Sequence, residues 1–360
     1  MAAISGVVGG DPRCDGSGKG TADCAGAPHQ PTAWLQRFNL HGNGTADPDM
    51  YNIRRLRLEV QQQTLDACAR GSYRLPDGTV IEIQPSPPLT LVQDAGCGEK
   101  PPRTPVDTSR DGGSVDSRGG RPPCVQVRDS DCLTEALLLR ERGLRVAVLN
   151  MANAYTPGGG WEAGAGAQEE NLHRRSNLHC FLADATGDAW RREGRGCYPI
   201  PDTGALYSPQ VCVLRGPEAA GYPFLPQPQL VDVLSCAARA HPQTVMVGGE
   251  QRLVPHEAAL LSANICNMLA LARTKGAQAL VLSALGCGAF CNPPKHVAEV
   301  FKEQLVGEFA DAFEEVVFAI FNDHNAYRSH NPEGNFVLFQ RVFADLDSDH
   351  RKAVTELMQW

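Results

Sequence analysis

Two adjacent acidic residues, Glu169 and Glu170, are the part of this sequence whose residue types and spacing best fit chemistry. Gln168 precedes them, and the three residues open a segment with helical spacing. At the start of a helix the dipole and the unpaired N–H groups stabilise negative charge, so a single acidic residue there needs no function. Here the carboxylates are paired and follow a glycine-rich loop that is long enough to wrap a ligand. The combination therefore predicts a functional site.

The loop before these carboxylates contains three consecutive glycines, Gly158 to Gly160. Asn150 and Asn153 precede the glycines, directly after an apolar run that is typical of a buried strand. Because glycine lacks a Cβ atom, it can adopt positive φ and expose its backbone N–H group to a phosphate or diphosphate. We expect this first loop to be an anion-binding cradle.

A second glycine loop, Gly286-Cys287-Gly288-Ala289-Phe290, follows the apolar run Ala279–Leu282 and precedes a predicted helix. A strand, a glycine turn and a helix start again describe an anion site. The loop partly resembles a dinucleotide-binding fingerprint, which raises a Rossmann domain as an alternative. Against it, Cys291 occupies the place of the third small residue, and the loop lies at the last crossover. Two such loops at the ends of parallel strands can instead hold one diphosphate from both sides.

The elements that must position these loops are strands alternating with helices. Continuous apolar runs predict strands at Leu144–Leu149, Ala279–Leu282 and Val316–Ile320, and shorter ones are expected at 124–127, 211–214 and 230–234. Helices are expected at Asp131–Arg142 and Pro255–Thr274. The alternation predicts a covered sheet of the α/β class.

Composition limits what the protein can bind. A net charge of −8 over 360 residues argues against holding duplex nucleic acid by a general basic surface. No run approaches the roughly 18 apolar residues of a membrane span. Thirteen scattered cysteines and the lack of a secretory signal at the first residues favour reduced thiols and an intracellular, cytoplasmic or nuclear location. Cys287, Cys291 and His296 form a weak zinc candidate, but without paired CxxC elements we expect no metal.

The glycine run, a short spacer and Gln-Glu-Glu resemble the signature of the microbial-type poly(ADP-ribose) glycohydrolases, a catalytic branch of the macrodomain superfamily. Asn153, Tyr207-Ser208-Pro209 and the loop Gly286–Phe290 appear in that family's order, over about residues 50 to 340. The resemblance implies a three-layer α/β/α macrodomain with a mixed, mostly parallel central sheet and no cofactor. Its substrate would be poly(ADP-ribose) or an ADP-ribosylated protein, and its product ADP-ribose.

The resemblance also implies roles for individual residues. Glu170 would protonate the departing ribose oxygen and then activate water, through an oxocarbenium-like state. Glu169 would hold ribose hydroxyls, Asn153 the distal ribose, and Phe321 or Phe336 the adenine. The residues implied in substrate binding are Asn150, Asn153, Gly158, Gly159, Gly160, Gln168, Gly286, Cys287, Gly288, Ala289, Phe290 and Phe321.

The expected domain division is a disordered tail over residues 1–50, a helical extension with a Gly/Pro-rich insertion over 51–123, the catalytic macrodomain over 124–345 and a C-terminal helix over 346–360. Two alternatives keep the fold: a hydrolase for mono-ADP-ribose on protein or nucleic acid, and a reader that binds ADP-ribose without turnover. The intact carboxylate pair argues against a reader, because binding alone does not need the second carboxylate.

Overall fold

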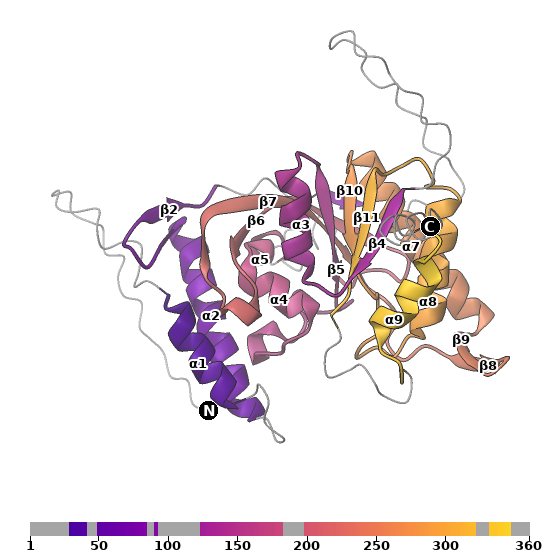
Figure 1. The fold of residues 1–360 in the computed structure, drawn as a ribbon, viewed down its shortest axis with the longest axis horizontal. Coiled ribbons are helices and arrows are strands. Elements are labelled where there is room, and N and C mark those ends of the chain that lie inside the picture. Colours follow the sequence, from indigo (N-terminus) through magenta and orange to yellow (C-terminus); the bar gives the residue numbers. More distant parts are fainter. Residues whose placement is uncertain are drawn as a thin grey trace, which may run out of the picture.

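The computed structural model describes residues 29–41, 49–84, 90–92, 123–182, 198–321 and 331–346. Its centre is a seven-stranded sheet (Figure 1) with the strand order β3-β6-β7-β5-β10-β11-β4. The pairs from β7 to β4 are parallel, whereas β6 pairs antiparallel with both β3 and β7. The predicted mixed, mostly parallel sheet is confirmed. In sheet order the strands are β3 (Thr90–Val92), β6 (Ala205–Arg215), β7 (Phe224–Cys236), β5 (Val146–Met151), β10 (Ala279–Leu282), β11 (Glu315–Ala319) and β4 (Cys124–Arg128).

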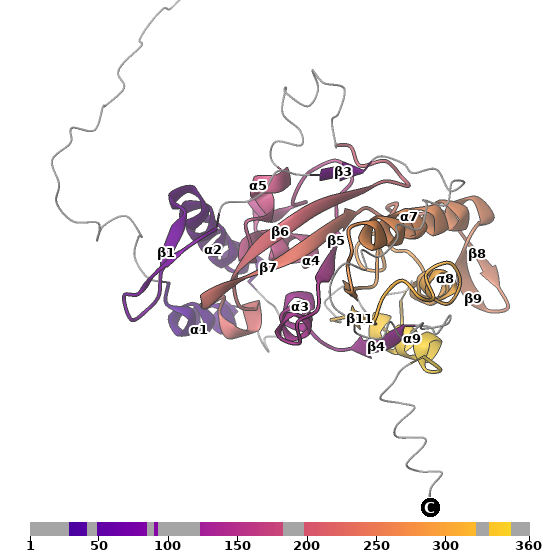
Figure 2. The same cartoon turned by 90° about the horizontal axis from the view of Figure 1, so that it is seen from above.

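Helices cover both faces of the sheet, which gives the predicted α/β/α layers (Figures 1 and 2). Strand β5 contributes side chains to the apolar clusters on both faces of the sheet, because successive side chains of a strand point to opposite faces. Val146 and Val148 pack with one apolar cluster, and Ala147 and Leu149 pack with the other. The first cluster lies under α3 (Cys132–Glu141), α4 (Gln168–Arg175) and α5 (Leu178–Leu182), and the second under α7 (Pro255–Thr274), α8 (Pro294–Val306) and α9 (Asn335–Phe343).

The strand order decides where the two glycine loops lie. Strands β5 and β10 are parallel neighbours, so their carboxyl ends meet at the same edge of the sheet. The first loop leaves β5 and leads to α4, and the second leaves β10 and leads to α8. Both loops therefore start from adjacent strands on one edge, where ligands of open α/β sheets bind.

The expectation of a disordered tail over residues 1–50 is wrong for α1 (Pro31–His41). Trp34 is only 3% exposed, packs on Leu56, Val60 and Tyr222, and donates its indole N–H to the Leu56 carbonyl oxygen at 3.0 Å. A short helix gains its stability from such tertiary contacts rather than from local propensity, so its sequence shows little of it.

The helix predicted after residue 50 is α2 (Met50–Arg70), which begins at an Asp49 cap and ends at Gly71 in the left-handed region. A hairpin of β1 (Ser72–Arg74) and β2 (Val80–Glu82) follows, with its turn at Pro76-Asp77-Gly78. The predicted helical extension is confirmed.

Two strands are longer than their apolar runs. Strands β6 and β7 extend well beyond the predicted 211–214 and 230–234, because their antiparallel pairing continues through polar residues, including Ser208 and Gln229. The polar segment 241–252 holds a hairpin of β8 (Thr244–Val247) and β9 (Glu250–Leu253). Nearly all of the expected insertion at 96–123 and of the C-terminal helix at 346–360 lies outside the described residues. Within the described ranges, no helix is both long and apolar enough to cross a bilayer.

Candidate active site

Glu169 is fixed by two backbone donors. Helix α4 begins at Gln168, as predicted, so the carboxylates lie in its first turn. Glu169 is 4% exposed, and its carboxylate accepts hydrogen bonds from the N–H of Asn153 at 2.7 Å and of Gly158 at 3.1 Å. Burial raises the pKa of Glu169 to about 8; the two backbone donors oppose this shift, and the neighbouring Glu170 adds to it. A carboxyl with this pKa carries a proton for much of the time near neutral pH.

Glu170 is held by one oxygen only. It is 8% exposed, and its Oε1 accepts a hydrogen bond from the Gly160 N–H at 2.9 Å. Its Oε2 is buried and has no hydrogen-bond partner within the described part of the chain. A buried polar atom without a partner is costly, so folds keep few of them without a functional reason. Of the four oxygens in the pair, Glu170 Oε2 is therefore the one available to exchange a proton with a ligand.

The first glycine loop holds the carboxylates rather than presenting free donors. Gly158 N–H is bound by Glu169, Gly160 N–H by Glu170, and Gly159 N–H by the Thr156 carbonyl oxygen at 3.0 Å. The expectation that these three N–H groups are exposed to an anion is wrong for this structure. The glycines are required for another reason: a Cβ atom on Gly159, at φ 56°, would lie 2.8 Å from Glu170 Oε1 and 2.9 Å from Glu169 Oε2.

Gln168 joins the start of α4 to the end of β5. Its Oε1 accepts a hydrogen bond from Met151 N–H at 2.9 Å, and its Nε2 donates to the Leu149 carbonyl oxygen. The side chain thereby continues the strand's hydrogen bonding where the backbone turns away. This geometry agrees with a role in positioning the loop.

The two asparagines before the glycines are engaged in the fold. Asn153 Oδ1 accepts hydrogen bonds from Tyr155 N–H at 2.8 Å and Thr156 N–H at 3.0 Å, which closes the start of the loop. Asn150 is fully buried and donates to Ser235 Oγ on β7 at 3.0 Å. Asn150 thus joins the sheet to the acidic pair, because its side chain also forms a hydrogen bond with the Glu169 carboxylate.

The second loop presents donors where the first does not. In the part of the chain that the structure describes, the N–H groups of Gly288, Ala289 and Phe290 have no acceptor. Gly286 adopts φ 73°, and the side chain of Asn292 donates to its carbonyl oxygen at 3.1 Å. The loop is thus held from below while three N–H groups remain available to an anion.

Cys287 contributes to this loop through its backbone alone. Its side chain is fully buried in the core, and burial raises the pKa of its thiol, so it is neither a nucleophile nor a ligand-contacting group. His296 Nδ1 accepts a hydrogen bond from the Leu253 N–H at 3.0 Å. These contacts leave the Cys287, Cys291 and His296 zinc candidate without support.

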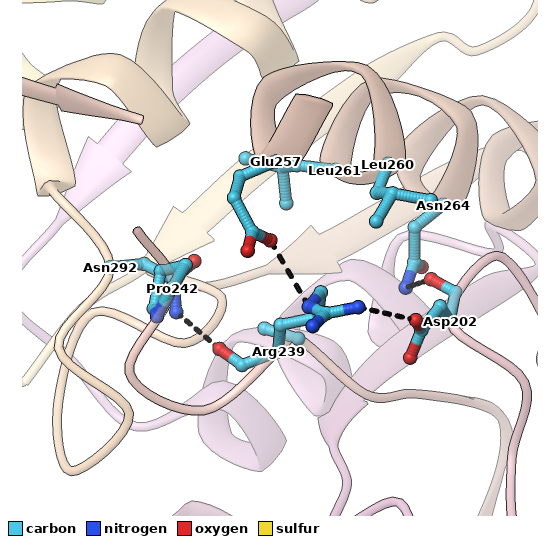
Figure 3. A pocket seen from close by; sticks show the side chains of 9 residues that line it. Asp202, Arg239, Pro242, Glu257, Leu260, Leu261, Asn264 and Asn292 are labelled. Carbon is cyan, nitrogen blue, oxygen red and sulfur yellow. Dashed lines mark hydrogen bonds and ion pairs between the residues drawn. The ribbon is translucent and has the colours of Figure 1, made fainter. Parts of the chain in front are cut away.

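A small pocket lies behind the second loop (Figure 3), lined by residues that include Asp202, Arg239, Glu257 and Asn292. Arg239 bridges Asp202 at 2.7 Å and Glu257 at 3.0 Å, and its carbonyl oxygen accepts from Asn292 at 2.9 Å. The charged groups of the pocket are thus paired with one another. Asn292 links them to the second loop, because its side chain donates both to the Arg239 carbonyl oxygen and to that of Gly286.

The three aromatic candidates differ in exposure. Phe321, two residues beyond the end of β11, is 72% exposed, whereas Phe290 packs partly against the core. Phe336, the other adenine candidate, also packs partly against that core. An exposed ring beside the functional edge of the sheet is free to stack on a planar ligand.

Helix α2 contributes to the site in a way that sequence reasoning missed. A Cβ atom on Gly164 would lie 2.5 Å from the Arg54 carbonyl oxygen, and one on Gly166 would overlap the Arg57 guanidinium. Arg57 also forms a bidentate ion pair with Glu218 at 2.9 Å. Helix α2 of the N-terminal extension therefore packs directly against the segment between the first glycine loop and α4. In the sequence, Gly164 and Gly166 were the only signals of this close approach.

The basic residues that follow the acidic pair on α4 form their hydrogen bonds and ion pairs with other groups. Arg175 bridges Asp131 at 2.6 Å, and Arg174 donates to Tyr222 Oη at 3.1 Å. His173 Nδ1 lies 2.9 Å from the Glu169 carbonyl oxygen. Both arginines are fully buried because α4 packs between the sheet and α2, so they cannot reach a phosphate at the surface.

The three-layer fold, with an acidic pair set over the end of β5, places the protein among the catalytic macrodomains. The model of the microbial-type poly(ADP-ribose) glycohydrolase catalytic domain matches residues 61–216. The glycohydrolase of Thermomonospora curvata is 28% identical, with 80% of this chain and 99% of that chain covered and a TM-score of 0.58. The glycohydrolase of Deinococcus radiodurans, solved in complex with ADP-ribose, is 30% identical over 64% of this chain and 87% of that chain, with a TM-score of 0.50.

No curated protein sequence matches the chain. On the family model and these structures, the chain belongs to the microbial-type poly(ADP-ribose) glycohydrolases.

Proposed function

We propose that this protein hydrolyses the terminal ribose–ribose O-glycosidic bonds of poly(ADP-ribose) and releases ADP-ribose, with Glu170 as general acid and base. The observation that carries the proposal is Glu170 Oε2, a buried carboxylate oxygen without a partner at the start of α4. The family of the chain supports the reaction type, because its members are glycosidases that act on this polymer.

The acidic pair can supply the proton that the first step needs. Two carboxylates this close do not ionise independently, and the raised pKa of Glu169 means that the pair retains a proton near neutral pH. In the reaction Glu170 protonates the departing ribose oxygen as the sugar becomes oxocarbenium-like, and then takes a proton from the attacking water. Glu169 holds the ribose hydroxyls and keeps the sugar carbon opposite Glu170.

The second loop is the part of the site that suits the diphosphate. Gly288, Ala289 and Phe290 offer backbone N–H groups, and the loop leads into the start of α8. The exposed ring of Phe321 is suited to stack on the adenine, and Phe290 to press on the sugar or diphosphate. The related Deinococcus radiodurans enzyme was solved with ADP-ribose, which is the ligand this arrangement fits.

The experiment that tests the proposal incubates the full chain with labelled poly-ADP-ribosylated and mono-ADP-ribosylated protein, with products resolved side by side. We expect release of ADP-ribose from polymer and a loss of about a hundredfold to ten-thousandfold for Glu170→Gln, the range that general acid–base groups contribute. ADP-ribose affinity, measured by calorimetry, should stay within a few-fold of wild type. Glu162→Gln is the matched control, since Glu162 lies in the same loop but is exposed.

Each other outcome identifies an alternative. Release from mono-ADP-ribosylated protein alone would point to a mono-ADP-ribosyl hydrolase, and binding without release to a reader. A fully active Glu170→Gln variant would exclude the assigned role of this residue.

A further inference from the structure

Two thiols and an imidazole converge away from the acidic pair. Cys68 lies near the end of α2, and His179 and Cys180 lie on α5. One ligand atom from each residue lies within 4.8 Å of the other two, and Cys180 Sγ lies 3.3 Å from His179 Nε2. Cys68 lies more than a hundred positions before the adjacent His179 and Cys180, so no local motif reveals the cluster.

The setting of the cluster is not that of ordinary core cysteines. A free cysteine most often serves as a small buried apolar group. Here Cys180 is exposed and Cys68 half-buried, and both face a histidine. His179 Nδ1 is buried and has no hydrogen-bond partner within the described ranges. Cys180 forms hydrogen bonds to both Cys68 and His179, so the three donor atoms already face one another.

We propose that Cys68, His179 and Cys180 bind a zinc ion that fastens helix α2 to helix α5. Two thiolates and one imidazole are a donor set that zinc prefers, with a fourth position left for water. Tetrahedral zinc, with bonds of about 2.0 to 2.3 Å, brings its ligand atoms to roughly 3.5 to 3.8 Å from one another. The observed spread needs only a modest contraction, which the exposed Cys180 side chain can make.

The ion would act on the catalytic loop through one aromatic contact. The His179 ring stacks on Trp161, with centroids 5.7 Å apart. A Cβ atom on Gly158 would lie 2.6 Å from the Trp161 indole, so the indole packs directly on this glycine. The Gly158 N–H in turn donates a hydrogen bond to the Glu169 carboxylate. Zinc would thus fix the ring that supports the loop holding the acids, without touching the substrate. This function goes beyond hydrolysis and does not depend on it.

The test measures metal, not activity. The full chain, kept reduced and free of chelator, should retain close to one zinc per molecule by elemental mass spectrometry. Replacement by cobalt should give a thiolate-to-cobalt charge-transfer absorption band. Cys68→Ser and Cys180→Ser should each lose that band and weaken zinc binding by more than about tenfold, a loss that removal of an outer-shell partner alone can produce. Cys266→Ser, a half-buried cysteine on α7, is the matched control and should bind as wild type does.

A fourth variant separates loss of the ligand from loss of the fold. His179→Phe keeps a ring on Trp161 but removes the nitrogen, so it should lose the cobalt band while its far-ultraviolet circular dichroism is unchanged. The proposal is overturned if reduced wild-type protein binds no zinc, or if Cys68→Ser and Cys180→Ser bind it as tightly as wild type. It is equally overturned if Cys68 and Cys180 form a disulfide in the isolated protein and bind no metal after reduction.

Discussion

The two glycine loops each join a strand to a helix, but they differ in whether their backbone N–H groups are already hydrogen-bonded within the described chain. In the loop Gly158–Gly160 all three N–H groups are bound inside the protein, two of them by the carboxylates of Glu169 and Glu170. In the loop Gly286–Phe290 the side chain of Asn292 holds the backbone from below, and three N–H groups stay unbound within the described chain. A strand, a glycine turn and a helix start therefore do not define an anion site. The acceptors already present in the fold decide whether the loop positions acids or binds phosphate.

The largest effect should come from adding a side chain to the first loop. In Gly159→Ala the new Cβ would lie less than 3 Å from both carboxylates, so we expect turnover to fall by about a thousandfold. ADP-ribose affinity should fall much less, because this loop does not supply the donors. Gly248→Ala is the control, since Gly248 has a similar φ of 60° but nothing within 4 Å of its Cβ position. Equal loss of affinity and turnover in Gly159→Ala would contradict the division of tasks.

The next largest effect should come from weakening the contact between α2 and the segment that follows the first loop. Arg57→Ala leaves the half-buried Glu218 without its bidentate partner, so we expect the free energy of unfolding to fall by about 3 kcal/mol and turnover to fall with it. Arg37→Ala breaks a more exposed pair with Glu59 and should cost less than about 1 kcal/mol. Denaturant unfolding with both variants measures the difference. Similar losses would show that α2 does not support the loop.

Removing one backbone donor from the second loop should lower ADP-ribose affinity more than turnover, the reverse of the effect expected in the first loop. Ala289→Pro deletes an unbound N–H, and the loss of one charge-assisted hydrogen bond, about 1.5 to 3 kcal/mol, corresponds to roughly a tenfold to hundredfold weaker affinity for ADP-ribose. Ala289→Ser retains the N–H and serves as the control. Calorimetry with ADP-ribose tests the prediction, and unchanged binding in Ala289→Pro would remove this loop from the diphosphate site.

The last prediction concerns the pH dependence of stability. Because the pKa of Glu169 rises from 4.5 in the unfolded chain to about 8 in the fold, the native state binds more protons between these values. Its contribution to stability is thus present at low pH and is lost as the pH rises through that window, by at most about 1.4 kcal/mol per pH unit. Glu169→Gln should therefore gain stability relative to wild type from pH 5 to pH 8. A difference that stays flat would show that Glu169 is ionised throughout.

The strands and helices around the site could be predicted from the sequence, because buried segments show as apolar runs or as helical spacing of apolar residues. The apolar runs at β5 and β10 and the periodicity of α7 fixed elements whose side chains have no alternative environment. The start of α4 at Gln168 followed from the same reasoning. These residues depend mainly on their neighbours in sequence and on burial.

What the sequence could not show depends on contacts between distant segments. Nothing local indicates that Glu169 takes the N–H of Asn153, or that Trp34 packs on Tyr222. The same holds for the three ligand candidates around Cys68. In each case the partner is chosen by the path of the chain through space, which a linear pattern does not contain.

The contacts between α2 and the central sheet determine where the chain could be cut into fragments that still fold. Arg215 on β6 is fully buried, and its guanidinium donates to Thr64 Oγ1 at 2.9 Å and to Gln63 Oε1 at 3.1 Å on α2. A fragment that starts at residue 124 would keep this charge in the sheet layer and lose both acceptors. We therefore expect the smallest piece able to fold on its own to reach back through α2, across the expected boundary at residue 124.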